Sequence, residues 1–150
     1  MKYVIREATI EDINKGLLEV FIEGYRYHQN GRPDIFANIS DEELKNDLIK
    51  NFDRLKTIVI LDTDKIVGYL SYIIKKRHTS KLDVDQLVIL EQYRGKGLGK
   101  KLMDEVREIA LNNNCDRIEL NCWLFNESAL AMYEHIGYVR QRIMYEIKLR

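Results

Sequence analysis

The clearest chemical signal in the sequence is a glycine-rich basic run, Gln92-Tyr93-Arg94-Gly95-Lys96-Gly97-Leu98-Gly99-Lys100-Lys101. Its three glycines alternate between a predicted strand and a predicted helix, and glycine lets a backbone turn tightly and approach a ligand without an intervening Cβ. The first turn of the helix offers unpaired N–H groups and the positive end of the helix dipole. Four basic side chains with no acid between them add charge, so the run predicts a local site for a phosphate-bearing ligand.

Two familiar phosphate motifs do not fit this run. A Walker A loop requires a hydroxyl residue after Gly-Lys, and Lys101 stands there instead. A dinucleotide fingerprint requires the spacing G-x-G-x-x-G, and the spacing here is G-x-G-x-G. A glycine-rich connection with a solvated basic face remains the plain structural alternative.

Length and composition restrict the remaining possibilities. The chain has 150 residues, which is enough for one domain over residues 1–150, and its formal net charge is zero. We therefore expect no nucleic-acid partner and no attraction to an anionic membrane. No segment has the length and apolarity of a signal peptide or a membrane span, so we expect a cytoplasmic protein in which Cys115 and Cys122 are reduced thiols.

Hydrophobic periodicity and capping residues predict the order β-α-α-β-β-β-α-β-α-β. Strands and helices alternate only in the second half, which favours a mixed α/β sheet with a parallel segment around the third helix. The expected strands are 3–6, 57–61, 66–74, 82–90, 117–123 and 138–149. The expected helices are 10–28, capped by Thr9; one beginning at Ser40-Asp41-Glu42-Glu43; 97–112; and one capped by Asn126 and ended by Gly137.

Two separated segments resemble the signature of the GCN5-related N-acetyltransferase (GNAT) superfamily. Arg94, Gly97 and Gly99 fit the coenzyme A loop pattern [R/Q]-x-x-G-x-[G/A], and Asn126–Tyr138 is similar to the later N-x-x-A-x-x-[F/L/M]-Y-[E/K]-x-x-G-[F/Y] segment. The resemblance implies the GNAT fold, a central mixed β-sheet flanked by helices, with acyl-CoA wedged where two adjacent parallel strands splay apart.

The implied activity is transfer of an acetyl group from acetyl-CoA to a primary amine of a small molecule or peptide by direct attack. The alternative is a non-catalytic domain that senses acyl-CoA or engages a partner; a nucleotide-binding protein is a weaker third possibility. The co-substrate contacts implied by the resemblance are Leu87, Val88, Ile89, Arg94, Gly95, Lys96, Gly97, Leu98, Gly99, Lys100, Asn126 and Tyr133.

The reaction makes three physical demands, and one residue is expected to meet each. The oxyanion needs a donor, and the resemblance assigns the backbone N–H of Val88 on a bulged strand. The thiolate leaving group benefits from a general acid, for which the motif assigns Tyr133. An alkylammonium, with a pKa of about 10.4, must lose a proton. Asp85 is the expected base, directly or through water, with Glu23 as a further candidate. In strict alternation Asp85 shares a face with Leu87 and Ile89.

Members of the family bind the acceptor mainly through their first two helices and later loops. Here we expect Tyr25, Tyr27 and Asp34 to frame a cationic amine by cation–π contact and charge, although a packed loop with solvated tips explains the same residues. Cys122 has no triad-like partner pattern, and the sequence holds no close His/Cys pair at ligand spacing, so neither a nucleophilic cysteine nor a metal site is expected. A homodimer is compatible with the sequence.

Overall fold

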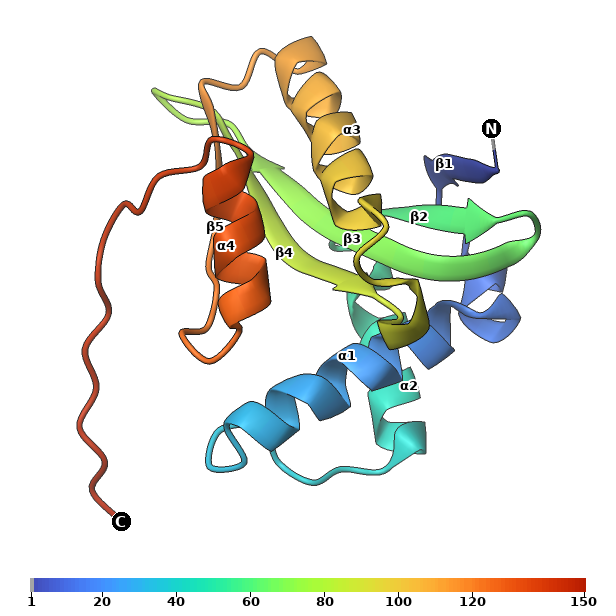
Figure 1. The fold of residues 1–150 in the computed structure, drawn as a ribbon, viewed down its shortest axis with the longest axis vertical. Coiled ribbons are helices and arrows are strands. Elements are labelled where there is room, and N and C mark those ends of the chain that lie inside the picture. The colour runs from blue at the N-terminus through green and yellow to red at the C-terminus, as the bar shows by residue number, and fades with distance from the viewer. Residues whose placement is uncertain (1) are drawn as a thin grey trace.

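A five-stranded mixed sheet forms the centre of the molecule, and the computed structural model describes it over residues 2–150 (Figure 1). The first four strands pair antiparallel in chain order, and the fifth pairs parallel with the fourth, so the predicted mixed sheet is confirmed. The strands are β1 (Tyr3–Glu7), β2 (Lys56–Asp62), β3 (Lys65–Lys75), β4 (Lys81–Ile89) and β5 (Arg117–Leu120).

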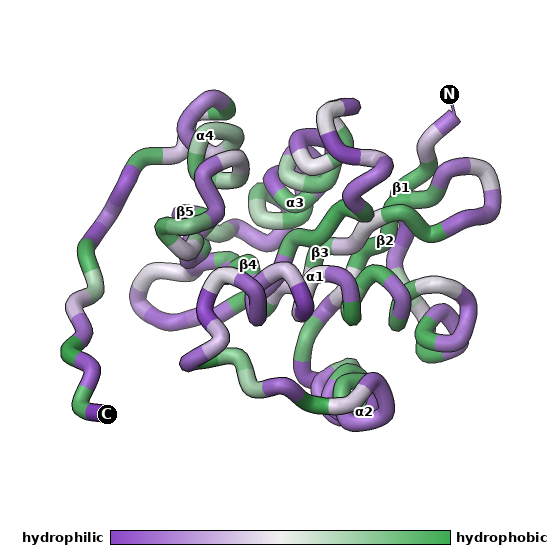
Figure 2. Tube along the Cα trace, turned by 60° about the horizontal axis from the view of Figure 1, so that its bottom comes forward, coloured by the Kyte–Doolittle hydropathy of each residue, from purple (hydrophilic) through white to green (hydrophobic). Residues whose placement is uncertain are grey.

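Helices cover both faces of this sheet (Figures 1 and 2). One face carries α1 (Leu17–Gly31) and α2 (Asp41–Phe52), and the other carries α3 (Leu98–Asn112) and α4 (Glu127–His135). Each face has its own apolar cluster. The first contains Leu17 and Val20 of α1, and the second contains Leu102 and Val106 of α3. The strand β4 therefore lies between two packed layers of helices.

The first predicted helix is interrupted, and this corrects the expected span of 10–28. Residues Ile10–Lys15 form a 3₁₀ helix, after which Gly16 takes a left-handed conformation with φ 118° and redirects the chain into α1. The helix α1 then continues three residues beyond the predicted end, to Gly31. The second helix begins as predicted, because the hydroxyl of Ser40 accepts a hydrogen bond from the Glu43 N–H at 3.1 Å.

A β-bulge on β4 changes the faces that the sequence predicted. Ser71 of β3 pairs with Gln86, whereas the next residue, Tyr72, pairs with Val84, so Asp85 is the extra residue on β4. The expectation that Asp85 shares a face with Leu87 and Ile89 was wrong, because a bulge resets the alternation of side chains along a strand.

The end of the chain also differs from its prediction. The strand expected over 117–123 ends at Leu120, and no strand forms over the expected range 138–149. The N–H of Tyr138 closes the end of α4 by donating to Tyr133 O at 2.9 Å, and the following residues run out as an extended segment (Figure 1). Among the described residues, no helix combines the length and apolarity that crossing a membrane would require.

Candidate active site

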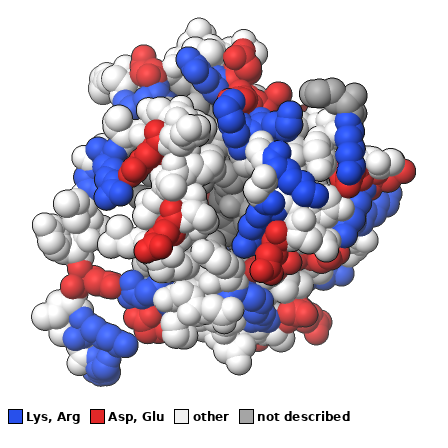
Figure 3. All heavy atoms as spheres, in the orientation of Figure 1, with Lys and Arg blue, Asp and Glu red and all other residues white. Residues whose placement is uncertain are grey.

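The sheet opens between its two parallel strands. Pairing between β4 and β5 runs from Lys81–Arg117 to Val84–Leu120, and β4 then continues to Ile89 with no partner on that side. The space-filling view shows a hollow over β4 between α3 and α4, with basic side chains gathered along its α3 side (Figure 3). An extended ligand that lies in this opening can reach the backbone of β4 directly.

The direction of the β4 amides decides which of them face the opening. The N–H of Leu90 donates to Val67 O of β3 at 2.9 Å. Because amides alternate along a strand, the Val88 N–H also points toward β3, and those of Leu87 and Ile89 point away from it. The carbonyl of Ile89 supports this, since it accepts a hydrogen bond from Arg94 Nε at 3.0 Å rather than from β3.

Val88 is instead held by packing on the α1 side of the sheet. Its side chain is buried, and a Cβ added at Gly24 of α1 would lie 2.7 Å from Val88 Cγ2. The absence of a side chain at Gly24 therefore lets α1 approach β4 closely. This contact fixes the distance between the helix and the strand that borders the opening.

The glycine loop leads from the end of β4 into α3 as predicted. Gly95 and Gly97 have φ values of 75° and 76°, which favour glycine, and a Cβ at either would meet nothing within 4 Å. Gly97 is the N-cap of α3, so the N–H groups of Leu98, Gly99 and Lys100 have no partner within the helix. The loop thus offers open space beside unpaired donors, which is the geometry of an anion site.

The basic side chains of the loop are partly committed elsewhere. The Arg94 guanidinium lies 3.9 Å from the Glu23 carboxylate and 5.4 Å from the Tyr27 ring centroid, so it leans toward α1. Lys100 pairs with Asp104 at 2.7 Å in an exposed position, and Lys96 lies over the Tyr93 ring at 5.1 Å. The unpaired backbone donors, more than these side chains, are free to meet an anion.

The helix α4 brings Asn126 and Tyr133 to the other side of the opening. The Asn126 Oδ1 caps the helix by accepting from the Ala129 N–H at 3.4 Å and also accepts from the Tyr27 hydroxyl at 3.2 Å. Two residues before the end of α4, Tyr133 is partly buried in the α3-side cluster. Burial, followed by the neighbouring Cys122 and Tyr138, raises the pKa of its hydroxyl, so it stays protonated at neutral pH.

The nearby cysteine does not have the environment of a nucleophile. Burial raises the pKa of the Cys122 thiol, and its Sγ lies 3.7 Å from the carbonyl oxygen of Trp123. A reactive cysteine requires a lowered pKa and a neighbouring cation or base. Cys122 therefore serves as a neutral wall beside Tyr133.

Asp85 lies at the bulge on the α1 and α2 side of the sheet. Partial desolvation raises the pKa of its carboxyl. The guanidinium of Arg54, which follows α2, and the hydroxyl of Ser71 lower this pKa by a smaller amount. Its charge in turn adds to the effect of burial in raising the pKa of Tyr69. The hydroxyl of Tyr69 donates a hydrogen bond to Gln86 Oε1. The Asp85 residue is exposed to solvent, so water reaches its carboxylate.

The predicted acceptor residues have different surroundings. The Tyr25 hydroxyl donates to Ala37 O at 2.7 Å, and Tyr27 binds Asn126 as described above. Asp34 is held by both nitrogens of the Arg32 fork at 3.0 and 2.9 Å, and these bonds lower the pKa of its carboxyl to about 2. Asp34 is therefore already neutralised by Arg32 and does not present a free charge to an amine.

Aromatic rings form a wall beside this region, and only part of it was expected from the sequence. The rings come from α1, from the loop after α1 and from the segment after β5. The centroids of neighbouring rings lie 5.5 to 6.2 Å apart. Gly31 makes the approach possible, because a Cβ there would lie 2.3 Å from the Phe125 ring. Trp123 and Phe125 were missed, although two aromatics spaced by one residue after a strand were a visible signal. The wall consists of Tyr25, Tyr27, His28, Phe36, Trp123 and Phe125.

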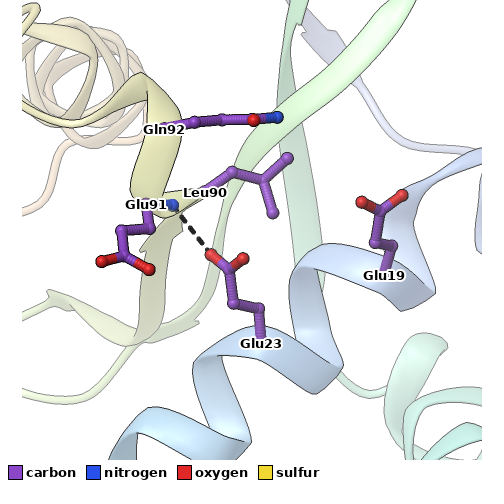
Figure 4. Close-up of a pocket in the computed structure, with 5 residues that line it drawn as sticks. All are labelled: Glu19, Glu23, Leu90, Glu91 and Gln92. Carbon is purple, nitrogen blue, oxygen red and sulfur yellow. Dashed lines mark hydrogen bonds between the residues drawn. The ribbon is translucent and has the colours of Figure 1, made fainter.

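A hollow with an acidic lining lies between α1 and the connection from β4 to α3 (Figure 4). It has a volume of about 390 Å³ and is lined by three carboxylates, with Glu23 accepting a hydrogen bond from the Glu91 N–H at 2.8 Å. Its wall residue Leu90 packs with the α1-side cluster, so the hollow lies on the α1 side of the sheet. Among residues 2–150, no group of three or more His, Cys, Asp or Glu side chains could hold a metal ion.

The fold and the site together define an acyl-CoA N-acyltransferase architecture. The sheet opens between the parallel strands β4 and β5, and a glycine loop leads from β4 into the helix α3. A family model described as "Acetyltransferase (GNAT) family" matches residues 19–138. The chain therefore belongs to the GNAT family, and the family predicted from the sequence is confirmed.

Several known proteins are similar to the chain. Mouse thialysine N-epsilon-acetyltransferase is 34% identical over 74 residues, which cover 48% of this chain and 44% of that protein. N-alpha-acetyltransferase 30 of Schizosaccharomyces pombe is 27% identical over 62% of this chain and 63% of the relative. The chain thus spans less than two thirds of these relatives. A solved integron cassette protein from the mobile metagenome of V. cholerae superposes with a TM-score of 0.81, at 27% identity, over 99% of this chain and 93% of that one.

Proposed function

We propose that the protein transfers the acetyl group of acetyl-CoA to a primary amine of a small molecule or peptide by direct attack. The observation that carries this proposal is the opening beyond the Val84–Leu120 pair, with an anion site at one end and a protonated tyrosine beside it. Membership of the GNAT family and relatives named as N-acetyltransferases support the same activity.

The co-substrate would be held at both ends of the opening. The first-turn amides of α3, Leu98, Gly99 and Lys100, would bind the pyrophosphate, next to the space left by Gly95 and Gly97. The amide of Ile89 and the side-chain Nδ2 of Asn126, whose oxygen already serves the helix cap, are placed to bind the pantetheine amides. These contacts would extend the thioester along β4 toward the point where β5 begins to pair.

The amide of Leu87 is our choice for the oxyanion donor, in place of Val88. It faces the opening and lies closer than Ile89 to the end of β4–β5 pairing, where an extended thioester would arrive. As the amine nitrogen attacks, the C–N bond forms and the carbonyl electron pair moves onto oxygen, which a fixed N–H stabilises. When the C–S bond breaks, the Tyr133 hydroxyl would donate its proton to the leaving sulfur.

Asp85 would accept the proton of the amine, directly or through water. Its raised pKa brings it nearer to the range in which a carboxylate is an effective base, and its exposure gives water access. Glu23 is less suited, because its carboxylate is bound to the Glu91 N–H at 2.8 Å and lies 3.9 Å from Arg94.

The acceptor would enter from the side of the aromatic wall. Aromatic faces attract a cationic amine, which agrees with the expected roles of Tyr25 and Tyr27. Asp34 would act differently from its expected role, because its bidentate pair with Arg32 positions the loop rather than the substrate. The names of the mouse and fission yeast relatives refer to lysine-like and N-terminal amines, and both classes belong in an acceptor screen.

The test is a screen of amines and short peptides with acetyl-CoA, in which free thiol and acetylated product are measured together. We expect equal amounts of thiol and product with at least one primary amine and a slower reaction with Tyr133→Phe. Binding of acetyl-CoA with no acetylated product from any amine would contradict the proposal and favour a non-catalytic acyl-CoA-binding domain.

A further inference from the structure

A histidine of α1 faces the opening between β4 and β5. Gly24, His28 and Gly31 recur at helical spacing, so they share one face of α1. A Cβ at Gly24 would lie 2.7 Å from Val88 Cγ2 in β4, and a Cβ at Gly31 would clash with the Phe125 ring. Both of these neighbours lie beyond the last pair of β4 with β5, so each borders the opening. His28 therefore stands between the two borders, on the α1 side.

A hydrogen bond fixes which nitrogen of His28 carries the proton. Nδ1 lies 2.8 Å from the carbonyl oxygen of Gly24, one helical turn back in α1. Because a carbonyl only accepts, Nδ1 is the donor, and Nε2 of the neutral ring keeps a free lone pair. Among residues 2–150, Ser71 Oγ is the one buried side-chain nitrogen or oxygen without a partner. Nε2 has no partner in this part of the chain either, so it is accessible rather than buried.

The neighbouring rings hold the imidazole in place without competing for Nε2. Its centroid lies 5.5 Å from that of Phe36, 5.9 Å from that of Phe125 and 5.7 Å from that of Tyr27. Two of these rings are hydrocarbons, and the Tyr27 hydroxyl donates to Asn126 Oδ1 at 3.2 Å. His28 is therefore the member of the aromatic wall that offers a basic nitrogen.

The acceptor nitrogen must lose two protons in acetyl transfer, and Asp85 accounts for one of them. An alkylammonium carries three hydrogens on nitrogen, and the amide product carries one. The first proton leaves before attack, because an ammonium has no lone pair. The second leaves once the C–N bond has formed and the nitrogen is positively charged again. This step needs a second proton acceptor on the side from which the amine arrives.

We propose that Nε2 of His28 accepts this second proton, an inference that rests on the proposed acetyl transfer. The amine lone pair forms the C–N bond, and the carbonyl electron pair moves onto oxygen. The nitrogen then gives a proton to Nε2 and keeps the electrons of the N–H bond. His28 is suited to this position because Tyr133 packs on the α3 side of the sheet, whereas the aromatic wall and His28 lie on the side where the acceptor would enter.

The remaining electrons and protons balance. The pair on oxygen returns to the carbonyl, and the C–S bond breaks with its electrons going to sulfur, which takes the proton of Tyr133. Asp85 and His28 then hold one proton each from the acceptor. One of these returns to Tyr133 through water, and the other enters the solvent, so one proton is released for each ammonium consumed.

Chemical rescue separates the basic nitrogen from the shape of the ring. His28→Ala should lower kcat roughly 100-fold with an acceptor amine found in the screen and leave acetyl-CoA affinity unchanged. Added imidazole should restore turnover, whereas pyrazole, a five-membered ring with two nitrogens but far weaker basicity, should not. The control is His78→Ala, whose exposed ring lies in the connection from β3 to β4, at the other end of β4. Its turnover should match that of the unaltered protein with or without imidazole.

A second variant decides if circular dichroism shows that His28→Ala has lost its fold. His28→Gln keeps a polar group in the wall that can hydrogen-bond the amine but takes up no proton at neutral pH. We expect kcat to fall while KM for the amine stays the same. Unchanged kcat in this variant would overturn the proposal.

The outcomes distinguish this inference from the proposed function. If the unaltered protein acetylates an amine and His28→Ala loses no turnover, His28 takes no proton and the inference is wrong, while acetyl transfer stands. Rescue by both rings, or by neither, would assign His28 to packing and would also overturn it. If the unaltered protein acetylates no amine, the proposed function fails, and this inference fails with it.

Discussion

The hydroxyl of Tyr27 on α1 donates a hydrogen bond to Oδ1 of Asn126, the N-cap of α4, at 3.2 Å. The two residues are 99 positions apart in the sequence, and Arg94 lies over the same tyrosine ring at 5.4 Å. The Tyr27 side chain thus joins α1, the glycine loop and the helix that carries Tyr133. The relative position of these three parts depends on contacts that no single motif contains.

Substitution of Asn126 should separate its structural role from its binding role. Asn126→Ala removes the cap of α4 and should lower the free energy of unfolding by about 1 kcal/mol. Asn126→Asp keeps a capping oxygen but loses the Nδ2 donor, so it should retain stability and bind acetyl-CoA about tenfold more weakly, as one lost hydrogen bond would predict. Thermal unfolding and calorimetric titration measure the two effects. Unchanged affinity in the Asp variant would remove Asn126 from the binding site.

The loop glycines should differ in their tolerance of a side chain. Gly97→Ala forces a left-handed conformation, which costs about 1 to 2 kcal/mol, and places a methyl group in the ligand space. Gly99→Ala lies in the helix with its Cβ 3.5 Å from Met132 Cε, so the fold should accept it. We expect a loss of stability only for Gly97→Ala, and Gly97→Val and Gly99→Val should both weaken acetyl-CoA binding. Full affinity in both Val variants would place the pyrophosphate elsewhere.

Tyr133→Phe should lower kcat by about 100-fold, as expected for loss of a general acid, with little change in acetyl-CoA affinity. Because burial raises the pKa of this hydroxyl, it should stay protonated through the neutral range and contribute no basic limb there. Tyr138→Phe is the matched control, since its ring centroid lies 6.1 Å from that of Tyr133. An equal loss of kcat in both variants would indicate a packing effect rather than proton donation.

Asp85→Asn should remove the acidic limb of the kcat/KM profile. The pKa of Asp85 is raised, so this limb should lie above the pH at which an ordinary aspartate titrates. A raised carboxyl pKa also means that ionisation opposes folding. Asp85→Asn should therefore be more stable than the unaltered protein at neutral pH, and the difference should vanish as the pH falls below the unfolded pKa.

The control for Asp85 compares acceptor amines of different pKa. A limb set by the substrate moves with the amine, whereas a limb set by Asp85 keeps its position. A variant with unchanged kcat/KM at every pH would leave water or Glu23 as the proton acceptor.

The residues that the sequence predicted well are those whose role is local. Gly97 at a helix start and Asn126 at a cap act within a few positions of the chain, so their spacing alone indicated their places. The face of the sheet on which Asp85 lies depends on a bulge opposite Ser71 and Tyr72. The sequence of one strand alone does not determine its register with another strand. Trp123 and Phe125 were missed for the same reason, because Phe36 meets Trp123 only after α1 and β5 are both in place.

The C-terminal segment shows a different limit of sequence reasoning. The alternation over 138–149 predicted a strand, which the structure does not form, because alternation along a segment does not say which strand it can pair with. The structure leaves Val139 and Ile143 exposed, and the expected strand has no partner strand among residues 2–150.

The most direct measurement of the central claim is amide exchange, residue by residue, with and without acetyl-CoA, followed by nuclear magnetic resonance. We predict that the ligand slows exchange at Leu87 and Ile89 and at Leu98, Gly99 and Lys100, and leaves Val88 unchanged, because its amide already faces β3. Protection confined to the acidic hollow around Glu19 and Glu91, with Leu87 and Ile89 unaffected, would contradict the account.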